Sequence, residues 1–286
     1  MAAAWRPPRS GARRLAALLL GACLPLAAGA DEGGEVHPCR EVVVFFEDPA
    51  AREPAQRLGE FVCGATRELS LALGLRHNQW ARLLLPGSMA SWQAVAGPAA
   101  GWAAALYTTA RRGLVVLRPG LQLSADVERN VTHELVHMLL DRVTAGRLPR
   151  WLNEGLAQYL SGDRTRGAPG LPASGDELVA LELRWRQPDL DPAERHLDYL
   201  RCLALTQRLI ERVGQDEVLG QLPAFRHLDG FLEWDLKNRF LRQWLFEDGP
   251  VEAGPAAAGQ GEEGEDQGGV TKLPLEQLLE EARKKR

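Results

Sequence analysis

Short apolar runs and helical patterns alternate along the first half of the chain. Residues 41–48, EVVVFFED, form a β-branched and aromatic run that predicts a strand, and residues 80–86, WARLLLP, predict a second strand. Residues 100–120 predict a hairpin that turns at residues 111–113. The pattern therefore places three or four strands ahead of residue 124.

Apolar positions at helical spacing predict the helices. They cover residues 54–73, 88–97, 124–143 and 196–214. Ser124 is the expected N-cap of the third helix, and Gly214 is expected to end the fourth. Residues 161–177 indicate a polar loop, and more helix is expected to about residue 247. This order indicates an α+β fold, with an N-terminal mixed sheet and helices followed by an all-helical C-terminal part.

Residues 1–30 have the organisation of an export signal. They begin with a segment that carries four arginines and no acidic residue, continue with the apolar LAALLLGACLPLAA, and end with small residues at Ala28 and Ala30. This order predicts a cleaved signal peptide and a periplasmic or secreted protein. The apolar run is interrupted by Pro25 and is too short to span a membrane. The segment LGAC also resembles a bacterial lipobox, so the alternative is a lipoprotein anchored through Cys23.

Charge argues against nucleic acid as a partner. The full chain has 34 basic and 38 acidic residues, a net charge of −4. Without residues 1–30, which hold four of the arginines and no acid, 30 basic residues face 38 acidic ones, a net charge of −8. Phosphate binding needs a basic face. No later stretch is long and apolar enough to predict a transmembrane span.

Three cysteines, Cys39, Cys63 and Cys202, remain after the export signal. Export permits a disulfide, and Cys39–Cys63 is the first candidate pair. Three buried thiols are the alternative. No Cys-x-x-Cys pair is present, which argues against a cysteine zinc site.

Composition divides the chain into a folded part and a tail. Residues 31–247 are expected to form one domain. Residues 248–272 are mostly acidic and glycine-rich, which predicts a disordered linker. Residues 273–286, LPLEQLLEEARKKR, predict one short terminal helix.

The segment HELVH places metal-binding side chains on one helical face. His133 and His137 are four residues apart, a little over one turn, so both imidazoles leave the same face and can bind one ion. Glu134 is rotated by about 100° around the helix. It does not readily join the histidines, but it can reach a water bound to the metal, as a general base does. The alternative is a polar helix face without a metal.

A catalytic zinc site needs a third protein ligand, with the fourth position left to water. No His-x-x-Gly-x-x-His continuation follows His137. Residues 148–160, LPRWLNEGLAQYL, predict a second helix with Pro149 near its start, and a short turn around Gly146 would fold it back antiparallel to the first. Glu154 on this helix is the candidate ligand, and a solvated or helix-capping acid is the alternative.

HELVH followed by RWLNEGLAQYL resembles the gluzincin metallopeptidases. The resemblance is greatest to the bacterial peptidase MA-like group, which is similar to the catalytic domain of aminopeptidase N. It extends over residues 40–245 and includes the order of elements, with strands first, then the paired motif helices, then a helical tail. It implies a zincin-like fold in which His133, His137 and Glu154 bind Zn²⁺ and Glu134 is the catalytic base.

The family also implies a tyrosine that donates a hydrogen bond to the developing oxyanion, at the start of a helix downstream of the ligand glutamate. Tyr199 matches that place, and Tyr159, near the ligand helix, is the competitor. Aminopeptidases of this kind carry a Gly-x-Met-Glu-Asn segment that holds the free amine of the substrate, and no such segment precedes Thr132. An endopeptidase or a peptidase of narrow specificity therefore fits the chain as well.

Other polar and aromatic residues receive structural interpretations. Trp151 is expected to pack the ligand helix on the core. Asp141, one turn after His137, is either a surface acid or a residue that orients a ligand imidazole. Structural or surface roles are expected for the histidines without a partner at ligand spacing: His37, His77, His196 and His227.

These observations predict zinc-dependent hydrolysis of peptide bonds in the cell envelope or outside the cell. Zinc would activate a water and polarise the scissile carbonyl, and Glu134 would pass the proton of that water to the leaving amine. The alternative is a zinc-binding envelope interaction or assembly module with weak or no catalysis. A non-peptidase hydrolase that uses the same chemistry is a third interpretation.

Overall fold

The computed structural model describes most of the chain between residues 33 and 246. The described residues are 33–75, 79–97, 103–109, 113–166, 168–185, 187, 190–227, 241 and 245–246. The predicted export signal (residues 1–30), linker (248–272) and terminal helix (273–286) lie outside them. Within the described part, none of the helices has the length and apolar character that crossing a membrane requires.

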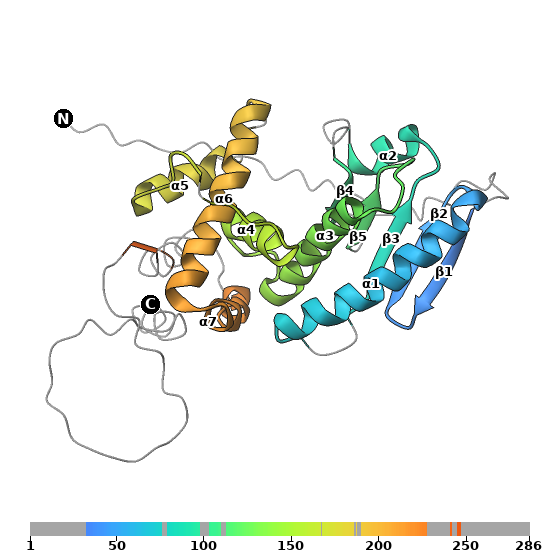
Figure 1. Ribbon diagram of the computed structural model, residues 1–286, viewed down its shortest axis with the longest axis horizontal. Coiled ribbons are helices and arrows are strands. Elements are labelled where there is room, and N and C mark those ends of the chain that lie inside the picture. Colours follow the sequence, from blue (N-terminus) through green and yellow to red (C-terminus); the bar gives the residue numbers. More distant parts are fainter. Residues whose placement is uncertain are drawn as a thin grey trace, which may run out of the picture. The chain divides into compact units, whose positions relative to one another are not determined.

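A five-stranded mixed sheet occupies the first half of the described chain (Figure 1). In spatial order its strands are β1 (Gly34–Cys39), β2 (Val42–Phe46), β3 (Ala81–Leu85), β5 (Leu114–Leu117) and β4 (Ala105–Thr108). The central strands β2, β3 and β5 are parallel, and each edge strand is antiparallel to its neighbour. The expected mixed sheet is confirmed, and so is the antiparallel pairing of β4 with β5.

The edge strand β1 is missing from the sequence-based prediction. Of its six residues, GEVHPC, only Val36 is buried. Pro38 has no N–H to donate, and the pairing register with β2 shifts between Val36 and Cys39. A strand with one buried position has no alternating apolar run, so the pattern of the sequence does not reveal it.

Seven α-helices are found among the described residues, and five of them follow the sheet. They are α1 (Arg52–Ala72), α2 (Met89–Ala96), α3 (Ala125–Thr144), α4 (Arg150–Leu160), α5 (Gly175–Arg184), α6 (Pro192–Val213) and α7 (Gln215–Gly220). Short 3-10 turns η1 (Pro49–Ala51) and η3 (Leu222–His227) accompany them. The described residues therefore form an α+β fold with a helical C-terminal part, as predicted.

The ends of the later helices follow local capping. The Ser124 side chain accepts a hydrogen bond from the N–H of Val127, so α3 begins where predicted. By contrast, α5 begins inside the predicted 161–177 loop, because Ser174 caps it in the same way. Asp191 caps α6, which begins at Pro192, four residues before the predicted start. Gly214, with φ of 90°, ends that helix as expected.

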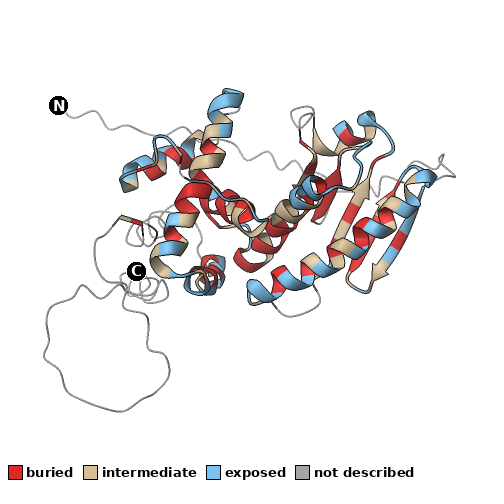
Figure 2. Ribbon diagram, viewed as in Figure 1, coloured by how far each residue is buried: buried red, intermediate tan, exposed pale blue. Residues whose placement is uncertain are grey.

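Helix α3 lies in the core between the sheet and the later helices. It packs against β4 and α1 on one side and α4 on the other. Leu135 and Leu139 of α3 and Trp151 of α4 are fully buried. Figure 2 shows that buried residues are concentrated along α3 and α4. The core role expected for Trp151 is confirmed.

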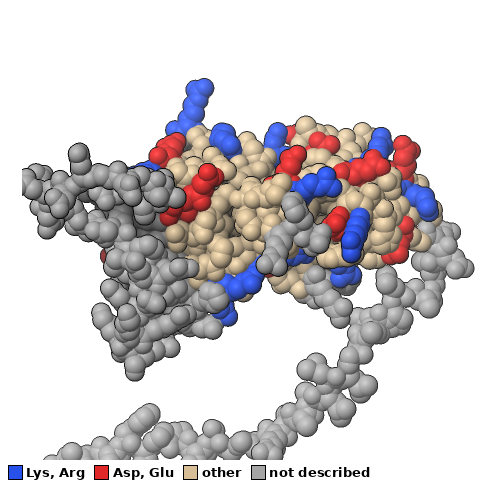
Figure 3. Space-filling view, turned by 90° about the horizontal axis from the view of Figure 1, so that it is seen from below, with Lys and Arg blue, Asp and Glu red and all other residues tan. Residues whose placement is uncertain are grey.

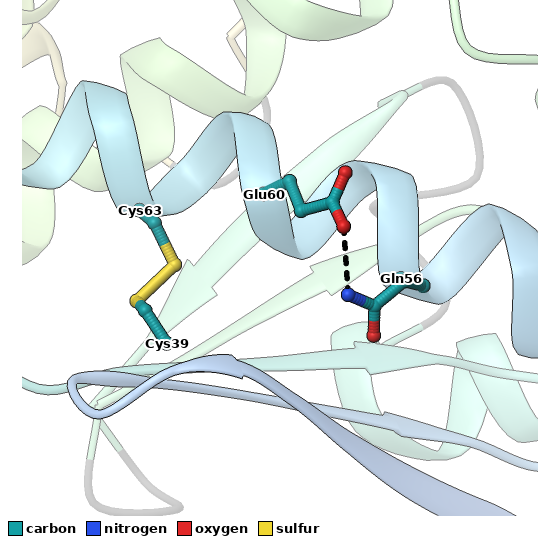
Figure 4. Close-up of a disulfide and its surroundings, with 4 residues drawn as sticks. All are labelled: Cys39, Gln56, Glu60 and Cys63. Atoms are coloured by element: carbon teal, nitrogen blue, oxygen red, sulfur yellow. Dashed lines mark hydrogen bonds between the residues drawn. A yellow bond between two sulfur atoms is a disulfide. The ribbon is translucent and has the colours of Figure 1, made fainter.

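One disulfide joins the sheet to α1. Cys39 at the end of β1 is bonded to Cys63, which confirms the candidate pair (Figure 4). On the same helix, the Gln56 side-chain amide donates a hydrogen bond of 2.8 Å to Glu60. The third cysteine, Cys202, is a free and buried thiol in α6. The bridge thus lies in the sheet half of the chain, apart from α3 and α4.

Charged side chains of both signs are interspersed on the face of the molecule shown in Figure 3. The described histidines outside the HELVH segment lie on the surface. His37 is exposed beside Glu35, with 3.1 Å between His37 Nε2 and Glu35 Oε1, and His196 is exposed on α6. His77 and the side chain of His227 lie outside the description.

Candidate metal centre

Helix α3 holds His133 and His137 against each other across one turn. Their Nε2 atoms are 3.0 Å apart, and their ring planes meet at 86° with the centroids 4.6 Å apart. The other faces of the same turns carry Leu135 and Met138, which are fully buried in the core. Core packing therefore anchors the stretch of α3 that presents both imidazoles.

Two consecutive left-handed residues turn the chain from α3 towards α4. Ala145 has φ of 55° and Gly146 has φ of 69°, and the N–H groups of both donate to the carbonyl oxygen of Asp141. Glycine adopts this conformation without a steric cost, which explains Gly146 in the turn. Pro149 precedes the first residue of α4, and the new helix packs against α3. The predicted short turn around Gly146 is confirmed.

Glu154 on α4 completes the cluster. Its Oε2 atom lies 3.4 Å from His137 Nε2 and 3.7 Å from His133 Nε2, and one ligand atom from each residue lies within 4.8 Å of the others. Oε2 is buried and receives no hydrogen bond from the described residues. A cation would satisfy this buried oxygen together with both nitrogens. Two histidines and one glutamate are a known ligand set of catalytic zinc sites, so the three residues fit zinc.

The carboxylate and the imidazoles stabilise each other's charged forms. Burial alone would raise the pKa of Glu154, but His137 and His133 hold it well below its usual range. Burial alone would lower the pKa of His137, but Glu154, Glu134 and Asn153 outweigh it and raise that pKa to about 9. Without a metal, a proton on His137 therefore takes the place of a cation.

The side chain of Asn153 orients His137. The Oδ1 atom of Asn153 contacts Nδ1 of His137. An amide oxygen carries no hydrogen, so Nδ1 must be the donor. In the neutral imidazole the lone pair is then on Nε2, which faces His133 and Glu154.

Glu134, the candidate base, is held by the edge strand β4. The backbone N–H of Tyr107 donates to Glu134 Oε2 at 2.6 Å. Burial raises the pKa of Glu134, although His137, His133 and this N–H oppose the shift. The result is a partly buried carboxylate of increased basicity beside the three candidate ligands.

The structure corrects both expectations for Asp141. Its Oδ2 accepts a hydrogen bond of 2.9 Å from the hydroxyl of Tyr107. Asp141 is thus neither a free surface acid nor the residue that orients a ligand imidazole, since Asn153 contacts His137 instead. It ties β4 to α3 one turn beyond the histidine pair.

Tyr199 and Tyr159 lie in different surroundings. Tyr199 is two turns into α6, stacked edge-on against Trp185 with the ring centroids 4.7 Å apart. Burial and the charge of Glu154 raise its pKa, while the positive charge of Arg150 opposes them. Tyr159 is instead covered by Arg164, whose Cζ atom lies 4.2 Å from the ring centroid. The charge of Glu154 therefore acts on the hydroxyl of Tyr199, whereas the Tyr159 ring is packed against an arginine.

Several residues of the site are not predicted by the sequence pattern. Three interactions join segments that are distant along the chain or lie on separate elements. They are the contact of Asn153 with His137, the hydrogen bond from the Tyr107 N–H to Glu134, and the stacking of Trp185 on Tyr199. Of these residues, only Asn153 could have been found from the sequence, because it directly precedes the candidate ligand Glu154 in the Asn-Glu-Gly segment. We found no family model that matches the chain and no curated protein that matches it.

Proposed function

We propose that the chain is an exported zinc-dependent peptidase of the gluzincin type, with a zincin-like domain at residues 31–247. The observation that carries this proposal is the convergence of His133, His137 and Glu154 around a buried carboxylate oxygen that accepts no hydrogen bond from the described residues. Zinc held by these residues would supply a Lewis acid that activates water and polarises a carbonyl.

Glu134 is the general base in this proposal. Its Oε2 is engaged by the Tyr107 N–H, which leaves Oε1 to accept the proton of the attacking water and deliver it to the leaving amine. Burial raises the pKa of Glu134, which makes the carboxylate a stronger proton acceptor. The protonated hydroxyl of Tyr199 would donate a hydrogen bond to the oxyanion.

The position of β4 favours a peptide over other carbonyl substrates. β4 is an edge strand, and its residue Tyr107 contacts the candidate base directly. An extended peptide can add to an open sheet edge through its backbone hydrogen bonds. A peptide that lies along β4 would therefore pass its backbone carbonyls close to Glu134.

Replacement of the base tests the proposal. Glu134→Gln removes the proton acceptor and leaves all three metal ligands, so hydrolysis should fall by about 10²- to 10⁴-fold with unchanged zinc content. Glu128→Gln, on the same helix but outside the cluster, is the matched control. The measurements are elemental analysis of the purified protein and mass spectrometry of a random peptide library.

Each part of the proposal has its own contradicting result. A wild-type protein without zinc, prepared in the absence of chelators, would contradict the metal site. Bound zinc without hydrolysis of any library member would instead favour the zinc-binding interaction module.

A further inference from the structure

Arg150, the first residue of α4, stands between the candidate centre and solvent. Its side chain is 54% exposed, and its Nε atom lies 3.7 Å from Oε1 of Glu154. The two oxygens of Glu154 thus have different neighbours, with Oε2 towards the histidines and Oε1 towards Arg150. A guanidinium is therefore present at the solvent side of the proposed zinc ligand.

Trp185 supports the Arg150 guanidinium from one side. The Cζ atom of Arg150 lies 5.2 Å from the Trp185 ring centroid, and Trp185 in turn stacks on Tyr199. A cation over an aromatic face is held in place while its N–H edges stay available. Among the described residues, no hydrogen bond is formed by the terminal nitrogens of Arg150, and its contact with Glu154 is longer than a hydrogen bond.

An ion pair with Glu154 alone does not explain Arg150. The pair joins a half-exposed arginine to a buried carboxylate across 3.7 Å, which is too long for a hydrogen bond. Glu154 already has two histidines to hold its charge. With a divalent cation bound, the charges of Glu134 and Glu154 would be offset, and Arg150 would remain as a positive charge on the solvent side of Glu154. Arg195 is a second positive charge close enough to Tyr199 to oppose the rise of its pKa.

We propose that Arg150 determines specificity by binding a carboxylate of the substrate close to the scissile bond. The planar guanidinium matches a carboxylate, and charge-assisted hydrogen bonds of this type are strong. The carboxylate is either the C-terminus of the substrate or an Asp or Glu side chain. The inference rests on the proposed function and names a substrate class for it.

Binding of uncleavable probes tests this inference without a measurement of activity. The probes are four peptide hydroxamates, in which the hydroxamate binds zinc. The first pair ends in glycine with a free carboxylate or a carboxamide, and the second pair is amidated and carries Glu or Gln at that position. Affinities for the zinc-loaded protein are measured by isothermal titration calorimetry.

We expect at least one carboxylate probe to bind about tenfold or more tightly than its amide partner. The pair that shows the difference identifies the source of the carboxylate. Arg150→Gln should abolish the difference in affinity between the carboxylate probe and its amide partner. Arg164→Gln is the matched control, because it also removes an arginine stacked on an aromatic ring, and it should keep the difference.

The possible failures are distinguishable. If carboxylate and amide probes bind equally to the wild-type protein, the role of Arg150 is wrong while the metal centre stands. If the Arg150→Gln variant still prefers the carboxylate probes, the role of Arg150 is likewise wrong while the metal centre stands. If no probe binds at all, the proposed function fails and the inference fails with it.

Discussion

Protons and metal ions compete for the same atoms at the candidate centre. Nε2 of His137 faces both Nε2 of His133 and Oε2 of Glu154, and the pKa of His137 is raised to about 9. A metal that binds here must therefore displace a proton from His137 at neutral pH. Glu154, with its pKa below the usual range, is ionised throughout and has no proton to lose.

The affinity for zinc should consequently depend on pH. Below the His137 pKa of about 9, each unit of rising pH increases the fraction of unprotonated His137 by about tenfold. Zinc affinity should therefore increase by about tenfold per pH unit. Above that pKa the increase should level off. Chelator-competition titrations between pH 7 and 10 would measure it. An affinity that stays constant between pH 7 and 9 would contradict the coupling of His137 to Glu154.

Removal of the Asn153 amide should weaken the metal site without removing a ligand. Asn153→Ala frees Nδ1 of His137, so the ring loses its fixed orientation and tautomer. Zinc affinity should fall by about 10- to 100-fold. Asn130→Ala, which removes an exposed amide earlier on α3, should leave zinc affinity unchanged. Equal affinities of the two variants in chelator competition would argue that Asn153 has no orienting role.

At the residue scale, helical geometry explains what could be predicted. His133 and His137 are neighbours on any α-helix, so their spacing alone implies that their ring nitrogens meet. The partner of Glu134 is different, because the Tyr107 N–H comes from a strand 27 residues away. The Arg150–Trp185 contact likewise depends on how α4 meets the segment after α5. No local pattern specifies such contacts.

At the element scale, the contact between α4 and α6 sets the position of Glu154. A Cβ atom on Gly155 would lie 2.1 Å from Oγ1 of Thr206 and 2.4 Å from the carbonyl oxygen of Cys202. The two helices therefore meet at Gly155 more closely than any side chain allows. The glycine of the Asn-Glu-Gly segment has a packing role, and the ligand directly before it depends on that packing.

Gly155→Ala should disturb both stability and metal binding. The new methyl group meets backbone of α6, so the helices must separate, at a cost of about 1–3 kcal/mol or more in the free energy of unfolding. The shift of α4 should also lower zinc content. Gly64→Ala in α1 is the matched control, since nothing lies within 4 Å of its Cβ position, and it should stabilise the protein by about 0.5–1 kcal/mol. Chemical denaturation and elemental analysis measure both effects, and a stable, zinc-loaded Gly155→Ala protein would contradict the close packing.

At this scale the sequence predicts elements well where burial is one-sided. The capping residues Ser124 and Gly214 and the apolar patterns of α1, α3 and α6 were sufficient to locate these helices. The edge strand β1 and the start of α5 escaped prediction for different reasons. β1 buries too little to show a pattern, and the cap at Ser174 lies in a polar segment that also suits a loop.

At the scale of the whole molecule, the disulfide and the candidate metal centre lie in separate parts. The Cys39–Cys63 bridge joins β1 to α1, whereas His133, His137 and Glu154 join α3 to α4. The two groups share no element. Cysteine count and histidine spacing predicted which residues come together in each group, because both are properties of the chain rather than of its packing.

Removal of the disulfide should thus separate stability from metal binding. The double variant Cys39→Ser, Cys63→Ser loses a bridge of sequence separation 24, which should cost about 3 kcal/mol in the free energy of unfolding. Zinc content of the folded variant should stay unchanged. Urea denaturation and elemental analysis would test both statements. Loss of zinc at a concentration of denaturant where the variant is still folded would show that the two regions are coupled.

The buried Cys202 has a consequence for oxidative folding. In the proposed exported protein, the thiols of Cys39, Cys63 and Cys202 would meet an oxidising compartment. A bond from Cys202 to either of the other two would keep α6 from reaching Gly155 on α4. In the native fold burial raises the pKa of Cys202, so its thiol is a poor nucleophile for disulfide exchange. Correct pairing is therefore a condition for bringing Glu154 to the two histidines. In the proposed zinc protein, mispaired chains should be recognisable because they lack zinc.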